Sequence, residues 1–171
     1  MRDALETPRL LLLPLSRELL MQTLGAGTFR AQGATFGEGW AGEAEVIFPL
    51  HLLNLGEEDA VRGSFAVVER ASGQATGLLG TKHAPEQGRV EIGYGLTEAG
   101  RGQGYATEAV GALLEHLRGW PDVQTVLAET LPDNRPSIRV LEKNSFTLTG
   151  RRTDSADGEL LCWARPLSQQ L

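Results

Sequence analysis

The chain has 171 residues, a net charge of −6 at neutral pH, and a composition of 41% hydrophobic and 22% charged residues. These values are typical of one globular domain, here residues 1–171, that can bury a core without disulfides or metals. The negative charge and the lack of a basic stripe argue against nucleic acid as the main ligand and favour a cationic substrate such as an amine.

The N-terminal third is predicted to open with a strand and a short helix. Leu10–Leu15 is a run of strand-like length, and Ser16–Leu24 reads as a helix with the serine as its N-cap. Residues 25–45 are rich in glycine and alanine and have few periodic apolar positions, so they predict a loop. Val46–Leu55 returns to helical spacing, with Pro49 tolerated only in the first turn.

The middle of the chain changes to strand patterns. Phe65–Val68, Ala75–Thr81 and Arg89–Leu96 are rich in β-formers and are separated by glycine and proline turns. Three consecutive strands with short connections predict an antiparallel meander.

The clearest periodicity follows Gly104. Apolar residues then recur with the i, i+3, i+4, i+7 spacing of an amphipathic helix, which Gly119 and Pro121 end. These apolar residues are Ala106, Ala109, Val110, Leu113, Leu114 and Leu117.

The C-terminal part continues with alternating elements. Val123–Thr130 predicts a strand, Pro136 opens a second helix, and strands follow near Phe146 and over Glu159–Arg165. Antiparallel strands followed by a strand–helix–strand–helix unit predict an α/β (mixed α+β) sheet whose strands run in both directions.

The turn before the long helix is a candidate anion site, with the sequence Arg101-Gly102-Gln103-Gly104-Tyr105-Ala106. Glycines let backbone N–H groups approach a bulky anion, and the helix N-terminus adds unpaired donors with partial positive charge. The turn lacks the lysine of a Walker motif and the third glycine of a Rossmann fingerprint. The alternative is that the glycines only make a flexible connection, but the strand, turn and amphipathic helix in sequence favour a diphosphate site.

Other classes of site are not expected. Cys162 is the only cysteine and the three histidines share no ligand spacing, which argues against a disulfide and a metal site. The run Leu10–Leu13 is short and is followed by Pro14, and no stretch approaches the length of a membrane-spanning helix. We therefore expect a cytoplasmic protein without a membrane partner.

Four segments, in chain order, resemble the GNAT superfamily of N-acetyltransferases, especially the branch that contains the ribosomal-protein N-terminal acetylases. They are Glu6–Leu10, Val90–Leu96, Arg101–Ala109, and Asn134–Lys143 followed by Phe146. Residues 16–60 match the family poorly. The resemblance implies a mixed, mostly antiparallel sheet of about seven strands flanked by helices, with a splayed bulge at the acetyl-CoA site.

The resemblance also implies direct transfer of an acetyl group from acetyl-CoA to a primary amine, on a protein N-terminus or a small molecule. Acetyl-CoA would be bound by the turn from Arg101 to Ala106 and by Asn134, which is also suited to cap its helix. Backbone N–H groups around Tyr94, Gly95 and Leu96 would bind the oxyanion. The Tyr94 side chain lines the pantetheine tunnel or packs in the core.

Two residues are candidates for acid–base chemistry. Glu91 shares a strand face with Gly93 and Gly95, so it is either the base for the amine or a carboxylate in a cross-strand pair. Ser137 resembles the residue that protonates the departing thiolate, and alternatively its hydroxyl caps backbone donors in the first helical turn.

Some positions depart from the family or carry a structural interpretation. The closing helix commonly ends Lys-Leu-Gly-Phe, whereas this chain has Lys143-Asn144-Ser145-Phe146, with Asn144 expected as a left-handed C-cap. Glu108 would repel a diphosphate and is interpreted as structural. The alternatives to an enzyme are a non-catalytic coenzyme A sensor or interaction module and a nucleotide-binding α/β protein. The oligomeric state stays open, a homodimer included.

Overall fold

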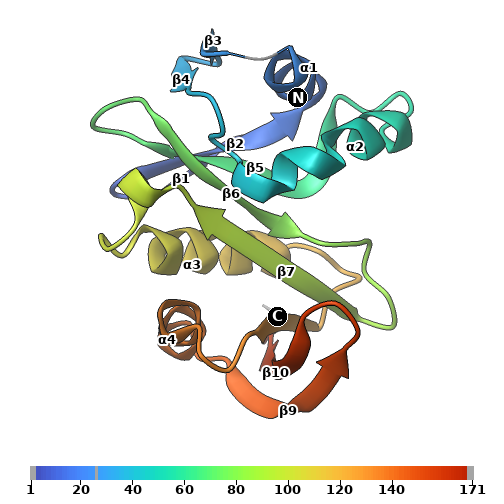
Figure 1. Ribbon diagram of the computed structural model, residues 1–171. Coiled ribbons are helices and arrows are strands. Elements are labelled where there is room, and N and C mark those ends of the chain that lie inside the picture. The colour runs from blue at the N-terminus through green and yellow to red at the C-terminus, as the bar shows by residue number, and fades with distance from the viewer. Residues whose placement is uncertain (1–2, 26, 169–171) are drawn as a thin grey trace. The chain divides into compact units, whose positions relative to one another are not determined.

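A computed structural model describes residues 3–25 and 27–168 of the chain (Figure 1). Its large sheet has eight strands in the order β1-β2-β5-β6-β7-β8-β10-β9, and β3 and β4 form a separate hairpin. The described pairings in the large sheet are antiparallel except β7 with β8, which is parallel. The predicted mixed, mostly antiparallel α/β sheet is confirmed, with eight strands instead of about seven.

The predicted strands and helices follow one another in the predicted order, and β1, β3 and β4 are additional strands. The strands are β1 (Leu5–Glu6), β2 (Leu10–Ser16), β3 (Phe29–Ala31), β4 (Ala34–Phe36), β5 (Ala60–Glu69), β6 (Ala75–Thr81), β7 (Arg89–Leu96), β8 (Thr125–Thr130), β9 (Thr147–Asp154) and β10 (Gly158–Pro166). The helices are α1 (Arg17–Leu24), α2 (Phe48–Asn54), α3 (Tyr105–Arg118) and α4 (Arg135–Lys143), with 3₁₀ turns η1 (Gly42–Ile47) and η2 (Glu98–Gly100). No helix in the described part of the chain is long and apolar enough to span a membrane.

The chain forms two compact units. The first consists of the residues up to Gly80 together with Tyr94–Ala112, and the second of Thr81–Gly93 together with Leu113 onward. Strand β7 and helix α3 therefore each have residues in both units. The residues of the predicted site are divided between the two units and are described unit by unit below.

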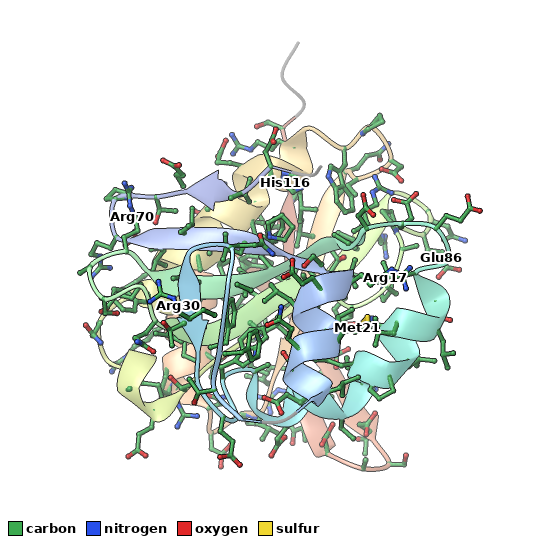
Figure 2. All side chains as sticks on the ribbon, turned by 90° about the horizontal axis from the view of Figure 1, so that it is seen from above. Arg17, Met21, Arg30, Arg70, Glu86 and His116 are labelled. Atoms are coloured by element: carbon green, nitrogen blue, oxygen red, sulfur yellow. The ribbon has the colours of Figure 1, made fainter. Side chains whose placement is uncertain are left out.

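In the first unit, α1 begins as predicted. The Ser16 hydroxyl accepts a hydrogen bond from the Leu19 N–H at 3.2 Å, and Leu19 and Leu20 are buried. The Met21 side chain of α1, labelled in Figure 2, has 60% of its surface exposed. Pro49 lies in the first turn of α2, the place where its missing N–H costs no hydrogen bond.

The loop predicted over residues 25–45 is wrong in part. The segment forms the β3–β4 hairpin, whose two turn residues Gln32 and Gly33 both have positive φ angles, 51° and 81°. The segment also contributes side chains to the hydrophobic core. Phe36 and Trp40 are buried, with ring centroids 4.9 Å apart in an edge-to-face arrangement. The residues just before α2 form the 3₁₀ turn η1, so that helix is shorter than the predicted Val46–Leu55.

In the second unit, β7 and β8 run parallel for only three residue pairs. The ladder joins Arg89–Glu91 to Thr125–Leu127, whereas β8 continues to Thr130 against β10. The pairing between β7 and β8 thus ends at Glu91, as expected for the splay that the resemblance implies. Gly93 lies two residues beyond that end.

The end of α4 differs from the prediction. Asn144 has a φ of −95° and is not left-handed, whereas Ser145 has a φ of 62°. The Ser145 N–H bonds the Glu142 carbonyl and the Phe146 N–H bonds the Leu141 carbonyl, each at 3.0 Å. This is the Schellman pattern, in which the residue after the C-cap takes the left-handed conformation.

Candidate active site

The glycine turn has the conformation that glycine favours. Gly102 and Gly104 have φ angles of 75° and 78°, in the left-handed region that other residues adopt at a cost. The first helical hydrogen bond runs from the Glu108 N–H to the Gly104 carbonyl at 3.1 Å. The N–H groups of Tyr105 and Ala106 therefore lie ahead of the helix's own bonding pattern, where a helix N-terminus attracts anions.

Two side chains of the turn bond the backbone of the segment just before it. Arg101 Nε donates to the Leu96 carbonyl and Gln103 Nε2 donates to the Ala99 carbonyl, each at 3.1 Å. Both bonds close the segment between the end of β7 and the start of α3. They use side-chain groups, whereas the prediction assigned the backbone N–H groups of the turn to the coenzyme.

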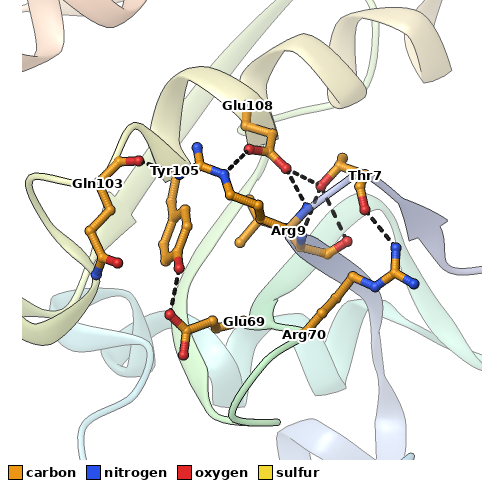
Figure 3. A network of polar contacts seen from close by, with 8 residues as sticks. Thr7, Arg9, Glu69, Arg70, Gln103, Tyr105 and Glu108 are labelled. Atoms are coloured by element: carbon orange, nitrogen blue, oxygen red, sulfur yellow. Dashed lines mark hydrogen bonds and ion pairs between the residues drawn. The ribbon is translucent and has the colours of Figure 1, made fainter.

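A carboxylate in the first turn of α3 accepts several hydrogen bonds from the connection between β1 and β2 (Figure 3). Glu108 accepts hydrogen bonds from the Thr7 hydroxyl at 2.6 Å, from the Arg9 backbone N–H at 2.9 Å and from Arg9 Nε at 2.7 Å. Burial alone would raise the pKa of Glu108, but these donors and the Arg9 charge hold it below its ordinary value. Glu108 is thus tied into the structure of this unit, which agrees with its structural interpretation.

Arg9 also reaches the turn itself, and sequence reasoning missed it. Its guanidinium donates to the Gln103 carbonyl at 2.6 Å and lies 4.8 Å from the centre of the Tyr105 ring (Figure 3). The Tyr105 hydroxyl donates in turn to the Glu69 carboxylate, and this hydrogen bond raises the pKa of Tyr105. The Tyr105 side chain is therefore bonded within the protein. The group of Tyr105 that we expect to contact an anion is its backbone N–H. The one sequence signal for Arg9 was its place in the Glu6–Leu10 resemblance.

The end of β7 lies close to β6 in the first unit. The Thr97 N–H donates to the Thr76 carbonyl at 2.7 Å, and a Cβ on Gly77 would come within 2.2 Å of the Gly95 carbonyl. Only glycine fits at residue 77 against this strand. Tyr94 and Leu96 are half-buried and Gly95 is exposed, so Gly95 is open to an approaching ligand.

In the second unit, Glu91 forms the cross-strand type of pair that was the alternative to a catalytic role. Its carboxylate lies 2.6 Å from Lys82 Nζ, and the Lys82 N–H bonds the Glu91 carbonyl at 2.8 Å. The Glu91 side chain keeps 20% of its surface exposed. Glu91 is therefore engaged in an ion pair, and its role as a base stays a prediction.

The Asn134–Ser137 pair also lies in the second unit. The Asn134 side-chain oxygen accepts a hydrogen bond from the Ser137 N–H at 3.3 Å, so Asn134 is the N-cap of α4. The Ser137 side chain is half-buried in the first turn. The predicted capping role of Asn134 is confirmed, and its contact with coenzyme A stays a prediction.

The predicted residues form two groups by unit. The first unit brings together the turn from Arg101 to Ala106 and the strand end from Tyr94 to Leu96, joined by the Arg101–Leu96 bond. The second unit holds Glu91, Asn134 and Ser137. Over residues 3–25 and 27–168, no three His, Cys, Asp or Glu side chains gather in a way that would hold a metal ion.

Comparisons with known proteins place this arrangement in a family. The sequence pattern of the GNAT acetyltransferase domain matches residues 9–147. An uncharacterised N-acetyltransferase of Bacillus licheniformis, p20, is 32% identical over 100 residues, which are 57% of this chain and 56% of that protein. The chain thus matches little more than half the length of this curated relative.

Two solved structures share the fold over nearly their whole length. A protein of Bordetella pertussis assigned to the GNAT acetyltransferases has 25% identity and a TM-score of 0.71, covering 96% of this chain and 99% of its own. RimL, a ribosomal α-N-protein acetyltransferase in complex with coenzyme A, has 18% identity and a TM-score of 0.69, covering 98% of this chain and 100% of its own. With the domain match over most of its length, the chain belongs to the GNAT family of acetyltransferases.

Proposed function

We propose that residues 1–171 form one GNAT domain that transfers the acetyl group of acetyl-CoA to a primary amine. The observation that carries the proposal is the turn with left-handed Gly102 and Gly104 at the N-terminus of α3. Its backbone N–H groups suit a diphosphate, which is the anionic part of coenzyme A. The complex of the RimL relative with coenzyme A supports this choice of donor.

In this proposal the donor is bound through backbone and capping groups. The turn from Arg101 to Ala106 takes the diphosphate, and the end of β7 from Tyr94 to Leu96 takes the pantetheine and acetyl carbonyl through its N–H groups. Asn134 contributes a polar contact beside its capping role. Hydrogen-bond donors aimed at a developing oxyanion are among the strongest catalytic devices in enzymes.

The chemical step needs one base and one acid. The amine nitrogen attacks the thioester carbon, the N–C bond forms, and the C–S bond breaks as the sulfur leaves as a thiolate. Glu91, which is paired with Lys82, takes the amine proton directly or through water, and Ser137 gives a proton to the thiolate and recovers one from solvent. Both residues come from the second unit.

The acceptor is proposed to be an amine on a protein N-terminus or a small molecule. The RimL relative is named for acetylation of a protein α-amino group. A net charge of −6 favours a cationic acceptor, since an acidic surface attracts a protonated amine before it loses its proton.

Two measurements test the proposal. Isothermal titration with coenzyme A and with ATP should show binding of coenzyme A alone. Thiol release from acetyl-CoA should then rise with at least one acceptor in a panel of peptides and small amines. Tight coenzyme A binding without turnover on any acceptor would instead indicate a sensor, and equal competition by ATP would indicate a nucleotide-binding protein.

A further inference from the structure

We propose that Arg9 is a positioning residue for the coenzyme-binding turn and that Glu108 holds Arg9 in place. The inference rests on the proposed function. It starts from one side chain that contacts three parts of the turn region: the Gln103 carbonyl, the Tyr105 ring and the Glu108 carboxylate. No part of the catalytic chemistry is assigned to Arg9.

The hydrogen bond from Arg9 to the Gln103 carbonyl also orients the N–H of the next residue, Gly104. In a trans peptide the carbonyl of one residue and the N–H of the next point in opposite directions across a rigid plane. Arg9 holds the Gln103 carbonyl at 2.6 Å and thereby turns the Gly104 N–H away from the guanidinium. Arg9 thus occupies the acceptor side of this peptide plane and leaves the donor side for an anion.

The left-handed φ of Gly104 makes such an anchor necessary. A glycine peptide rotates more freely than any other, so an unanchored turn would lose entropy when it binds a ligand. Arg9 Nη2 lies 3.3 Å from the position that a Cβ on Gly104 would take, so the guanidinium packs directly against this residue.

The charge of Glu108 explains why the anchor is an arginine. A carboxylate in the first turn of α3 would repel a diphosphate bound at the same helix end. The Arg9 guanidinium, with Nε 2.7 Å from Glu108 Oε2, neutralises that carboxylate. The planar guanidinium also donates to the carboxylate and to the Gln103 carbonyl at once, which a lysine ammonium does with much less geometric control.

Arg9 is fixed at its backbone as well. Its N–H donates to Glu108 at 2.9 Å and its carbonyl accepts from the Arg70 N–H at 2.9 Å. The backbone N–H and carbonyl of Arg9 are therefore both bonded, which fixes the main chain from which its side chain reaches the turn. The contacts of the β1–β2 connection with α3 thus bring an ordered arginine to a loop more than ninety residues away in sequence.

The test uses Arg9→Lys, which keeps the charge and loses the guanidinium fork, in the full chain. Isothermal titration should show coenzyme A binding about tenfold weaker, since a tenfold loss corresponds to about one hydrogen bond. Amide hydrogen exchange over residues 102–106 in the ligand-free protein should become faster by about the same factor. Glu108→Gln should change both in the same direction by a smaller factor.

Arg70→Lys is the matched control, because Arg70 donates to the Thr7 carbonyl at 2.8 Å in the same N-terminal segment instead of to the turn. It should leave binding and turn exchange within about twofold of the wild type. The inference is overturned if Arg9→Lys binds coenzyme A as tightly as the wild type, or if the turn exchanges at the wild-type rate. If the wild-type chain does not bind coenzyme A, the proposed function fails, whereas exchange in the ligand-free protein still decides whether Arg9 orders the turn.

Discussion

Replacing Ser145 with glycine should stabilise the protein. Ser145 is exposed, has a φ of 62°, and occupies the left-handed position that ends α4. A residue with a Cβ in this conformation costs about 1–2 kcal/mol relative to glycine. Because both bonds of the Schellman motif at this helix end are made by backbone groups, glycine keeps them.

The net gain is smaller than the relief of strain. Glycine has more conformational freedom in the unfolded chain than serine, which lowers the free energy of unfolding by about 0.5–1 kcal/mol. The expected increase in the free energy of unfolding is therefore about 0.5–1 kcal/mol, and Tm should rise by about 1–4 °C for a chain of this size. Thermal unfolding by circular dichroism and urea titration measure the two quantities independently.

Two further variants separate this effect from others. Ser145→Ala keeps a Cβ in the left-handed position and should give no gain in stability. Arg139→Gly places a glycine on an exposed position within α4 and should destabilise the protein by about 1 kcal/mol. A fall in Tm for Ser145→Gly, or the same Tm as for Ser145→Ala, would show that the serine is not strained.

Three other predictions follow from single contacts. Thr130→Val should destabilise the protein by about 1–3 kcal/mol in urea unfolding, because it leaves the buried Trp163 Nε1–H, now 3.0 Å from the Thr130 hydroxyl, without an acceptor. Thr130→Ser keeps a hydroxyl and should restore the stability. An unchanged stability of Thr130→Val would contradict the role of this bond. Glu108→Gln should cost about 1–3 kcal/mol at neutral pH. Because the pKa of Glu108 is lowered on folding, its contribution is present above the ordinary value of 4.5 and is lost as the pH falls through the folded pKa, so a cost independent of pH would refute this assignment. Gly104→Ala should weaken coenzyme A binding about tenfold or more by titration calorimetry. The control is Gly158→Ala, at a similar φ of 75° in the second unit, which should leave the binding unchanged. Equal losses of affinity in the two variants would count against the turn as the site.

Local patterns predicted most of the elements because they were long or carried strong signals. The helix after Gly104 is amphipathic over its whole length, so its start and its end at Arg118 could both be predicted. The β3–β4 hairpin has strands of three residues and a Gln32-Gly33 turn in place of the common Asn-Gly, so neither signal of a hairpin was strong. Its burial depends on aromatic contacts with other segments, which periodicity does not report.

The candidate site could be predicted where its residues are adjacent in sequence and not where contacts are long-range. The glycine turn and the Asn134 cap are local features, and both have the expected conformation. The pairing of Glu91 with Lys82 was open between two interpretations, because the strand register decides which side chains meet. Arg9 could not be assigned at all, since its bonds to Gln103 and Glu108 exist only after the sheet and α3 have packed.

The hydrogen bonds around the turn share a direction that bears on ligand binding. Arg9, Arg101 and Gln103 each donate a side-chain N–H to a main-chain carbonyl of this region, at Gln103, Leu96 and Ala99 respectively. Such bonds consume acceptors and leave backbone donors for a ligand, which is the balance that an anion requires. Because these bonds are made within the protein, part of the entropy of ordering the glycines is lost on folding and not on binding. In the proposed coenzyme site, the shape of the turn therefore depends in part on Arg9, a residue outside the turn whose contacts are with the protein itself.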